Sequence, residues 1–177
     1  MASLEGHFLI AMPGMGDPNF SETVAFLCKH DEEGAIGIVI NRPSGMLVSE
    51  IFDQLELESN CGTDAGQPVM NGGPVEPDRG FVLHQSEQAF DATVNVSAPV
   101  KVTVSQDVLK EMASGKGPSP ALVALGYSGW ASGQLEAEIA ANACKAHQRD
   151  RHGGDCRYVR CHCGNVHADP QTLANFS

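Results

Sequence analysis

The alternation of apolar and polar side chains in the first half of the chain predicts short strands joined by tight turns. Residues 22–30 (ETVAFLCKH) follow a two-residue period, as expected for a strand. One face of this predicted strand carries Val24, Phe26, Cys28 and His30. Residues 35–43 (AIGIVINRP) form a second apolar run, and the DEEG segment between the two runs is typical of a turn. The two runs therefore predict a β-hairpin.

Later segments show the wider period of amphipathic helices. Residues 47–57 carry apolar side chains at positions i, i+3, i+4 and i+7, which predicts a helix with Ser49 as its N-cap. Residues 106–115 predict a second, shorter helix that is capped by Ser105 and ended by a glycine.

A third helix is predicted to begin within residues 133–143 (GQLEAEIAANA). Leu135 and Ile139 are expected to face inward because they lie four positions apart on one side of the helix. The carboxylates of Glu136 and Glu138 are expected to face other directions.

Three further apolar segments, all after residue 78, predict strands. They are residues 79–85 (RGFVLHQ), the two halves of 92–105 on either side of Pro99, and residues 121–128 (ALVALGYS). Strands and helices therefore do not alternate regularly, which predicts an α+β fold. A length of 177 residues, 42% of them hydrophobic, predicts one domain with its own core.

The composition of the chain indicates in which cellular compartment the protein is expected. The longest apolar run, residues 35–40, is far shorter than a membrane span, and the first residues lack the basic and apolar regions of an export signal. We therefore expect a cytoplasmic protein with no membrane association. The six cysteines are then expected to be reduced thiols or metal ligands rather than disulfides.

Charge divides the chain into two parts. Residues 1–143 hold 19 acidic and 6 basic side chains, whereas residues 144–177 hold 3 acidic and 5 basic ones. An acidic core repels phosphates unless its basic side chains gather in one patch, and this core has few of them. Direct DNA binding is therefore not expected.

Four segments of the acidic part are characteristic. They read GHFLIAMPGMGDPNF, CKHDEEGAIGIVINRP, NGGPVEPDRGFVLH and ALGYSGWASGQLEAEI. In this order they resemble the YqgE/AlgH family of bacterial proteins, from about Gly6 to Ala143. The resemblance implies an α+β fold with a bifurcated, barrel-like, mixed or antiparallel sheet and flanking helices. It implies no particular reaction, although some members are labelled transcriptional regulators.

The resemblance divides the chain into a family-like core (1–143), an atypical segment (144–168) and a short family-like remnant (169–177). The atypical segment is dense in cysteine and histidine and contains the four residues of a candidate zinc site, Cys156, Cys161, Cys163 and His167. Their C-x4-C-x-C-x3-H spacing lacks the usual C-x2-C pair. We interpret the segment as the product of compensating frameshifts that packs as no designed element and holds no intended metal. A divergent zinc tail and a disordered extension are the alternatives.

The sharpest candidate for chemistry in the core is the pair Cys28 and His30. If both lie on one strand face, a nearby imidazolium could lower the thiol pKa and create a reactive thiolate. The alternative interpretation is a buried cysteine beside a histidine that bonds a backbone group. The GYSGW segment matches only the first half of a serine-hydrolase elbow, so its glycines more simply predict a strand-to-helix turn beneath Trp130.

Polar and glycine residues in predicted loops are candidates for a ligand site. They are Asp17, Asn41, Arg42, Gly72, Gly73, Glu76 and Arg79. The NGGPV segment could present backbone N–H groups to an anion, but it has neither dinucleotide-binding nor P-loop spacing, and a plain turn is the alternative. No cofactor is therefore expected.

Two functions remain open from the sequence. The first is a non-enzymatic regulatory protein that binds a protein or small-molecule partner, because the core contains no complete catalytic constellation. The second is a thiol-dependent or anion-binding enzyme that uses Cys28 and His30.

Overall fold

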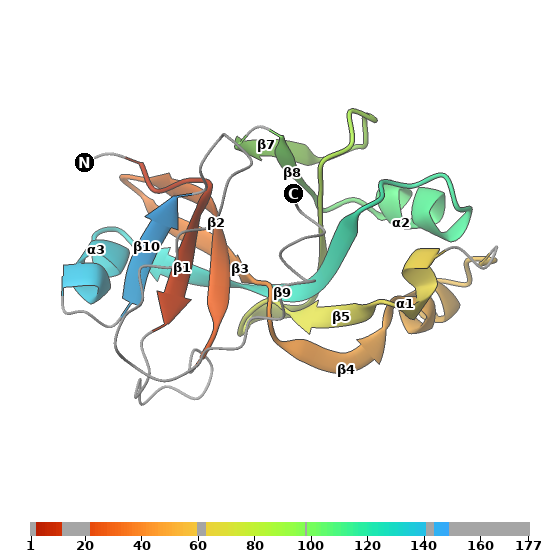
Figure 1. Ribbon diagram of the computed structural model, residues 1–177, viewed down its shortest axis with the longest axis horizontal. Helices are drawn as coiled ribbons and strands as arrows, with labels where there is room; N and C mark the ends of the chain where they lie inside the picture. The colour runs from red at the N-terminus through yellow and green to blue at the C-terminus, as the bar shows by residue number, and fades with distance from the viewer. Residues whose placement is uncertain (1–2, 12–21, 60–62, 98, 141–143, 149–177) are drawn as a thin grey trace.

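A computed structural model describes residues 3–11, 22–59, 63–97, 99–140 and 144–148 (Figure 1). Its first five strands are β1 (His7–Ala11), β2 (Val24–Asp31), β3 (Gly34–Val39), β4 (Pro43–Leu47) and β5 (Pro68–Asn71). The other strands are β6 (Val75–His84), β7 (Thr93–Ser97), β8 (Val100–Thr103), β9 (Ala121–Ala131) and β10 (Cys144–Gln148). The helices are α1 (Val48–Gln54), the 3-10 helix η1 (Thr63–Gly66), α2 (Gln106–Ala113) and α3 (Gln134–Ala140).

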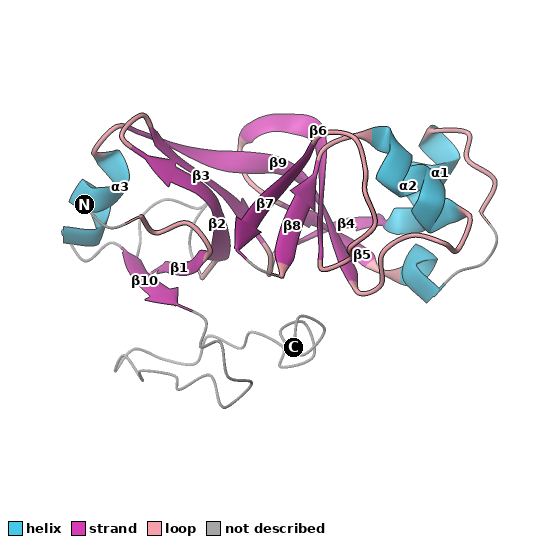
Figure 2. Ribbon diagram, turned by 90° about the horizontal axis from the view of Figure 1, so that it is seen from above, coloured by secondary structure: helices cyan, strands magenta, loops and turns pink. Residues whose placement is uncertain are grey.

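The strands form one branched, curled sheet. Its main path runs β10-β1-β2-β3-β9-β6-β8-β7, and β5 pairs with both β4 and β9. Strand β9 is the branch point: it pairs antiparallel with β3 and β6 and parallel with β5. Figure 2 shows α3 at one end of the sheet and α1 and α2 at the other. The predicted α+β class, single domain and bifurcated mixed sheet are confirmed.

The hydrophobic core consists of three clusters of buried side chains. An inner cluster lines the curl of the sheet and includes Phe26, Ile38, Phe81 and Leu83. A second cluster beneath α1 and α2 includes Phe52, Val82, Val108 and Met112. A third cluster beneath α3 includes Leu27, Trp130 and Leu135. Successive residues of β2 and β6 alternate between clusters because adjacent side chains of a strand point to opposite faces.

Both early helices form where the apolar period predicted them, with one correction at a cap. Residue Leu47, not Ser49, is the N-cap of α1, and its backbone N–H donates to Glu50 Oε2 at 2.6 Å. For α2 the predicted N-cap Ser105 is confirmed, but its hydroxyl donates to the carboxylate of Asp107 instead of capping a backbone N–H.

The expected strand-to-helix turn in GYSGW is wrong. Strand β9 continues through this segment to Ala131, and α3 begins at Gln134. The glycine inside the strand, Gly126, has φ +73° and lies against the backbone of Gly73. A local pattern of glycines cannot distinguish a turn from a strand that is crossed closely by another segment.

The expectation of no ordered element in residues 144–168 is wrong for the first five of them. Strand β10 (Cys144–Gln148) pairs antiparallel with the whole of β1. An edge strand gains backbone hydrogen bonds on one side, so it can form without an alternating apolar pattern. In the described part of the chain no helix is long and apolar enough to span a membrane.

Candidate functional site

The predicted turn at Gly72 and Gly73 is a crossing point of two chain segments. Gly72 N–H donates to Leu125 O at 2.7 Å, and Gly72 O accepts from Val39 N–H at 2.9 Å. A Cβ atom on Gly72 would lie 2.3 Å from Gly126 O, and one on Gly126 would lie 2.4 Å from Gly73 O. The glycines therefore allow two backbones to touch. Because Gly72 N–H is already bonded, it is not a donor for an anion.

A small exposed surface lies immediately after this crossing. We call it the crossover surface and define it as the exposed Val75, Glu76 and Arg79, the partly buried Tyr127, and the buried Phe81 ring beneath Arg79. The Arg79 guanidinium donates to Glu76 Oε2 at 2.8 Å, and both side chains are about half exposed. Arg79 also lies over the Phe81 ring, 5.7 Å from its centroid, and that ring meets Tyr127 edge-on at 5.8 Å.

Two other predicted ligand residues, Asn41 and Arg42, lie beside the crossing. Asn41 Oδ1 accepts from Val24 N–H at 2.8 Å, and its amide group donates to Glu22 O at 3.0 Å. Arg42 O accepts from Asn71 N–H at 2.7 Å. The Asn41 side chain thus holds β2 to the end of β3. Of the predicted ligand residues, Asp17 lies outside the described residues.

Cys28 and His30 do not share a strand face. The pairing of β2 with β3 shifts between Leu27 and Lys29, so Cys28 is the extra residue of a β-bulge. Cys28 packs against the inner cluster, whereas His30 pairs with Ala35, which belongs to the cluster beneath α3. The prediction of a shared face is wrong because the bulge inserts one residue and reverses the alternation beyond it.

The surroundings of Cys28 oppose thiolate formation. Its Sγ atom donates to Phe26 O at 3.5 Å. Burial, followed by the negative charge of Glu5, raises the pKa of the Cys28 thiol to about 12. A thiol with this pKa is almost entirely protonated at neutral pH, so it is a poor nucleophile.

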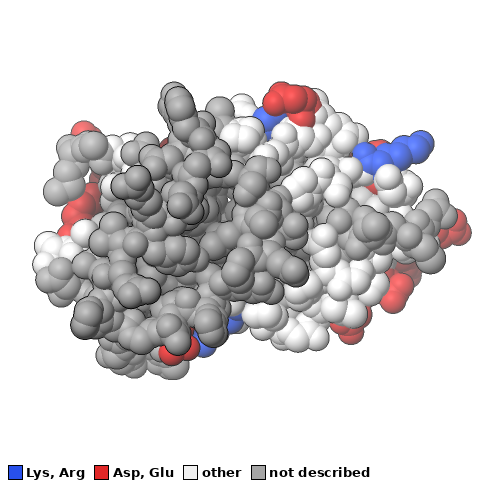
Figure 3. Space-filling view, viewed as in Figure 1, with Lys and Arg blue, Asp and Glu red and all other residues white. Residues whose placement is uncertain are grey.

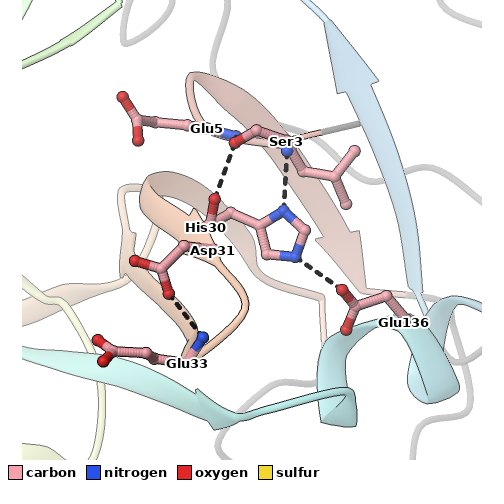
Figure 4. A network of polar contacts seen from close by, with 7 residues as sticks. Ser3, Glu5, His30, Asp31, Glu33 and Glu136 are labelled. Atoms are coloured by element: carbon pink, nitrogen blue, oxygen red, sulfur yellow. Dashed lines mark hydrogen bonds and ion pairs between the residues drawn. The ribbon is translucent and has the colours of Figure 1, made fainter. Parts of the chain in front are cut away.

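The imidazole of His30 joins the N-terminal segment to α3 (Figure 4). Leu4 N–H donates to Nδ1 at 2.9 Å, which fixes Nε2 as the protonated nitrogen of the neutral ring. Nε2–H in turn donates to Glu136 Oε1 at 3.0 Å. Both ring nitrogens are therefore engaged, and neither is available to remove a proton from another residue.

The remaining serine candidate, Ser128, is not accessible to a substrate. Ser128 is fully buried within β9, and its Oγ lies 3.5 Å from Gly72 O. Among the described residues, no three or more histidine, cysteine or acidic side chains lie together as a metal site. The zinc candidates Cys156, Cys161, Cys163 and His167 lie outside the described residues.

Three polar residues take roles that sequence reasoning missed. Glu136 and Glu138 were expected to face away from the sheet, but Glu138 Oε2 accepts from Trp130 Nε1–H at 2.9 Å and Glu136 bonds His30. His84 is fully buried at the end of β6. Its only signal in the sequence is its position two residues after Val82, on the same face of an apolar run.

Comparison with known proteins agrees with this fold. A family described as AlgH-like matches residues 8–152. A UPF0301 protein from Chromobacterium violaceum is 49% identical over 140 residues, which are 79% of this chain and 75% of that protein. Another from Saccharophagus degradans is 47% identical over 141 residues, covering 80% of this chain and 69% of that protein.

Two solved structures are also similar. The solution structure of AlgH from Pseudomonas aeruginosa superimposes with a TM-score of 0.71 at 46% identity, covering 84% of this chain and 79% of that one. A crystal structure of a protein from Corynebacterium diphtheriae has a TM-score of 0.66 at 20% identity, covering 85% of this chain and 78% of that one. At 20% identity, the similarity to the Corynebacterium diphtheriae protein supports only a shared fold.

Proposed function

The chain belongs to the AlgH-like family, and from this premise we propose that it is a non-enzymatic regulatory protein that binds a partner through the crossover surface. The single observation that carries the proposal is the engagement of both His30 ring nitrogens, by Leu4 N–H and by Glu136. The enzyme alternative requires Cys28 and His30 to act together, but they lie on opposite faces of the sheet. Burial also raises the pKa of the Cys28 thiol, which opposes formation of a thiolate.

The crossover surface has the composition of a binding surface. It places a guanidinium, a carboxylate and the partly buried Tyr127 ring near Val75, which is 36% exposed, above the buried Phe81 ring. Arginine and tyrosine are enriched at the centres of protein interfaces because they combine apolar area with directed hydrogen bonds. The surface also stands on β6 and β9, two strands that the core fixes, so binding requires little ordering of the backbone.

The charge of the chain favours a partner other than nucleic acid. The net charge is −11, which repels phosphate groups and attracts basic surfaces. On the face shown in Figure 3, the visible Lys and Arg side chains lie apart from one another and gather into no basic patch. We therefore expect no specific binding to duplex DNA, and a sequence-dependent gel shift at physiological ionic strength would contradict this expectation.

The experiment begins with the full chain purified from its own host under mild conditions. Native mass spectrometry identifies a bound protein or small molecule, and calorimetry then measures its affinity with purified components. The variant Arg79→Glu is expected to weaken binding at least tenfold because it removes the guanidinium and repels Glu76. The matched control is Lys29→Glu, because Lys29 is equally exposed (51%) and is also paired with a carboxylate, that of Asp31.

Equal affinity of Arg79→Glu and wild type for the identified partner would show that the partner does not bind through the crossover surface. An equal loss in both variants would instead indicate a general effect of added negative charge. Turnover of a bound small molecule by the wild-type chain would contradict the non-enzymatic role itself.

A further inference from the structure

His84 occupies an unusual position for a titratable group. It is the last residue of β6 and is fully buried. Directly opposite on β9 lies Ala121, a member of the cluster beneath α1 and α2, so His84 faces that cluster. The segment that follows, residues 85–92, is an irregular loop that passes over the histidine and places the Phe90 ring edge-on against it, 5.5 Å between centroids.

A chain of hydrogen bonds fixes the tautomer of His84. Thr93 Oγ1 donates its only proton to Phe90 O at 3.0 Å. The 2.7 Å bond between Thr93 and Thr103 must therefore use the proton of Thr103. Thr103 Oγ1 then has only an acceptor site left for His84 Nε2, 2.8 Å away, so Nε2 carries the proton. The other nitrogen, Nδ1, is a buried acceptor with no hydrogen-bond partner.

In the closed structure, protonation of His84 is unfavourable for two reasons. It would create a buried N–H group on Nδ1 with no acceptor, which is costly. It would also place a positive charge beside Lys101, which lies directly opposite His84 on β8. The carboxylate of Glu87, on the loop, is already bonded to Lys101 Nζ at 3.1 Å.

Hydrogen bonds at Asp91 and Ala92 also hold the loop, and they do not depend on a group that titrates in the same pH range as the histidine. Asp91 N–H donates to Asp107 Oδ2 at 2.8 Å, and the Ser105 hydroxyl, which donates to Asp107, also lies close to Asp91 O. Burial raises the pKa of Asp107, but hydrogen bonds from Ser105 and from backbone N–H groups outweigh it and hold that pKa below its ordinary value. Asp107 therefore stays ionised while a histidine titrates.

We propose that His84 is a pH-sensitive latch that keeps residues 85–92 closed over the end of the sheet while it is neutral and releases them when it is protonated. Burial, followed by the charge of Lys101, lowers the pKa of His84 below its ordinary value of 6.5 in the closed form. Opening of the loop returns the imidazole to water and restores its affinity for a proton. The ratio of open to closed forms therefore rises as pH falls below about 6.5, by up to about tenfold per pH unit.

Amide hydrogen exchange of the full chain tests the latch. Peptides covering residues 85–95 are compared at pH 7.5 and pH 5.5, with exchange times scaled for the chemical rate. Protection in these peptides is expected to fall by several-fold to tenfold at the lower pH, whereas protection of the β2–β3 hairpin is expected to remain. The variant His84→Gln, which keeps a donor toward Thr103 but cannot become charged, is expected to lose this response. The control His7→Gln removes a histidine whose Nδ1 lies 3.3 Å from Glu5 O in an exposed contact, and this variant is expected to keep the pH response.

The same pH response in wild type and His84→Gln would overturn the proposal, as would equal protection of residues 85–95 at both pH values. If His84→Gln does not fold, titration of the wild-type imidazole by NMR tests the latch instead. A ring that keeps Nε2–H as its only proton to well below pH 6.5 supports the latch, and a ring that is protonated at or above this pH overturns it.

Discussion

The His30 imidazole and the Glu136 carboxylate connect β2 to α3 through a 3.0 Å contact between Nε2 and Oε1 (Figure 4). The two residues are 106 positions apart in the chain. A hydrogen bond to its own backbone N–H, followed by the one from His30, lowers the pKa of Glu136, so the carboxylate remains an acceptor in mildly acidic solution. Together with Leu4, this pair attaches the N-terminal segment, the β2–β3 hairpin and α3 to one another.

The variant His30→Ala is expected to lower the free energy of unfolding by about 1–3 kcal/mol, because it leaves the Leu4 N–H without its acceptor. Urea denaturation followed by the fluorescence of Trp130, the only tryptophan in the chain, measures the loss. The control His7→Ala removes an imidazole from a more exposed position and is expected to change stability by less than about 0.5 kcal/mol. Equal stabilities of the two variants would contradict the role of His30.

Cys28 is expected to react slowly with alkylating agents. With a pKa of about 12, the thiol should be modified at pH 7.5 at least about tenfold more slowly than free cysteine. Peptide mapping by mass spectrometry measures the rate at this position, and the chain unfolded in guanidinium serves as the control in which the ordinary rate returns. Stoichiometric alkylation of Cys28 at pH 6, faster than that of free cysteine, would restore the thiol-enzyme alternative.

Alanine at the crossing of the two backbones should be strongly destabilising. In Gly126→Ala, a new Cβ atom would lie 2.4 Å from Gly73 O on a residue with φ +73°, and we expect a loss of more than about 2 kcal/mol. The matched control is Gly66→Ala, where no atom lies within 4 Å of the new methyl group. A urea midpoint of Gly126→Ala close to that of Gly66→Ala would show that the strands can separate at little cost.

Stability should fall in acid because of His84. Above about pH 6.5 this histidine is neutral in both the folded and the unfolded chain, so its contribution is complete. At lower pH the unfolded chain binds the proton more readily, and the free energy of unfolding falls by up to about 1.4 kcal/mol per pH unit until the folded form is protonated too. Urea denaturation at pH 7.5 and 5.5 should show a smaller decrease in His84→Gln than in wild type. A decrease of the same size in both would assign the acid sensitivity to other groups.

Zinc is not expected to hold the C-terminal part of the chain. Elemental analysis of the full chain after desalting should find far less than one zinc per molecule, and Cys161→Ser should leave stability unchanged. One tightly held zinc per chain, with loss of stability on chelation, would instead identify Cys156, Cys161, Cys163 and His167 as a genuine site.

The sequence by itself determined most of the elements of the fold. The two-residue period of 22–30 and the apolar run of 35–43 predicted the β2–β3 hairpin. The helical period of 47–57 predicted α1, and the cap and stop residues of 106–115 predicted α2. These predictions succeeded because each pattern depends on neighbours within a few positions, where the local period and the buried face must agree. Strands β4 and β5 escaped prediction because they are short and contain Pro43 and Pro68, which weaken any strand pattern.

Only the tertiary structure decided which candidate residues meet. One extra residue at Cys28 reversed the alternation of β2 and turned His30 toward α3, and nothing in the local pattern marks such a bulge. The bonds from Glu136 to His30 and from Glu138 to Trp130 depend on how α3 docks on the sheet. The contact between Gly73 and Gly126 depends on the path of β9 through both branches. Such contacts follow from the register of distant strands, which the packing of the whole core selects and which no short stretch of sequence contains.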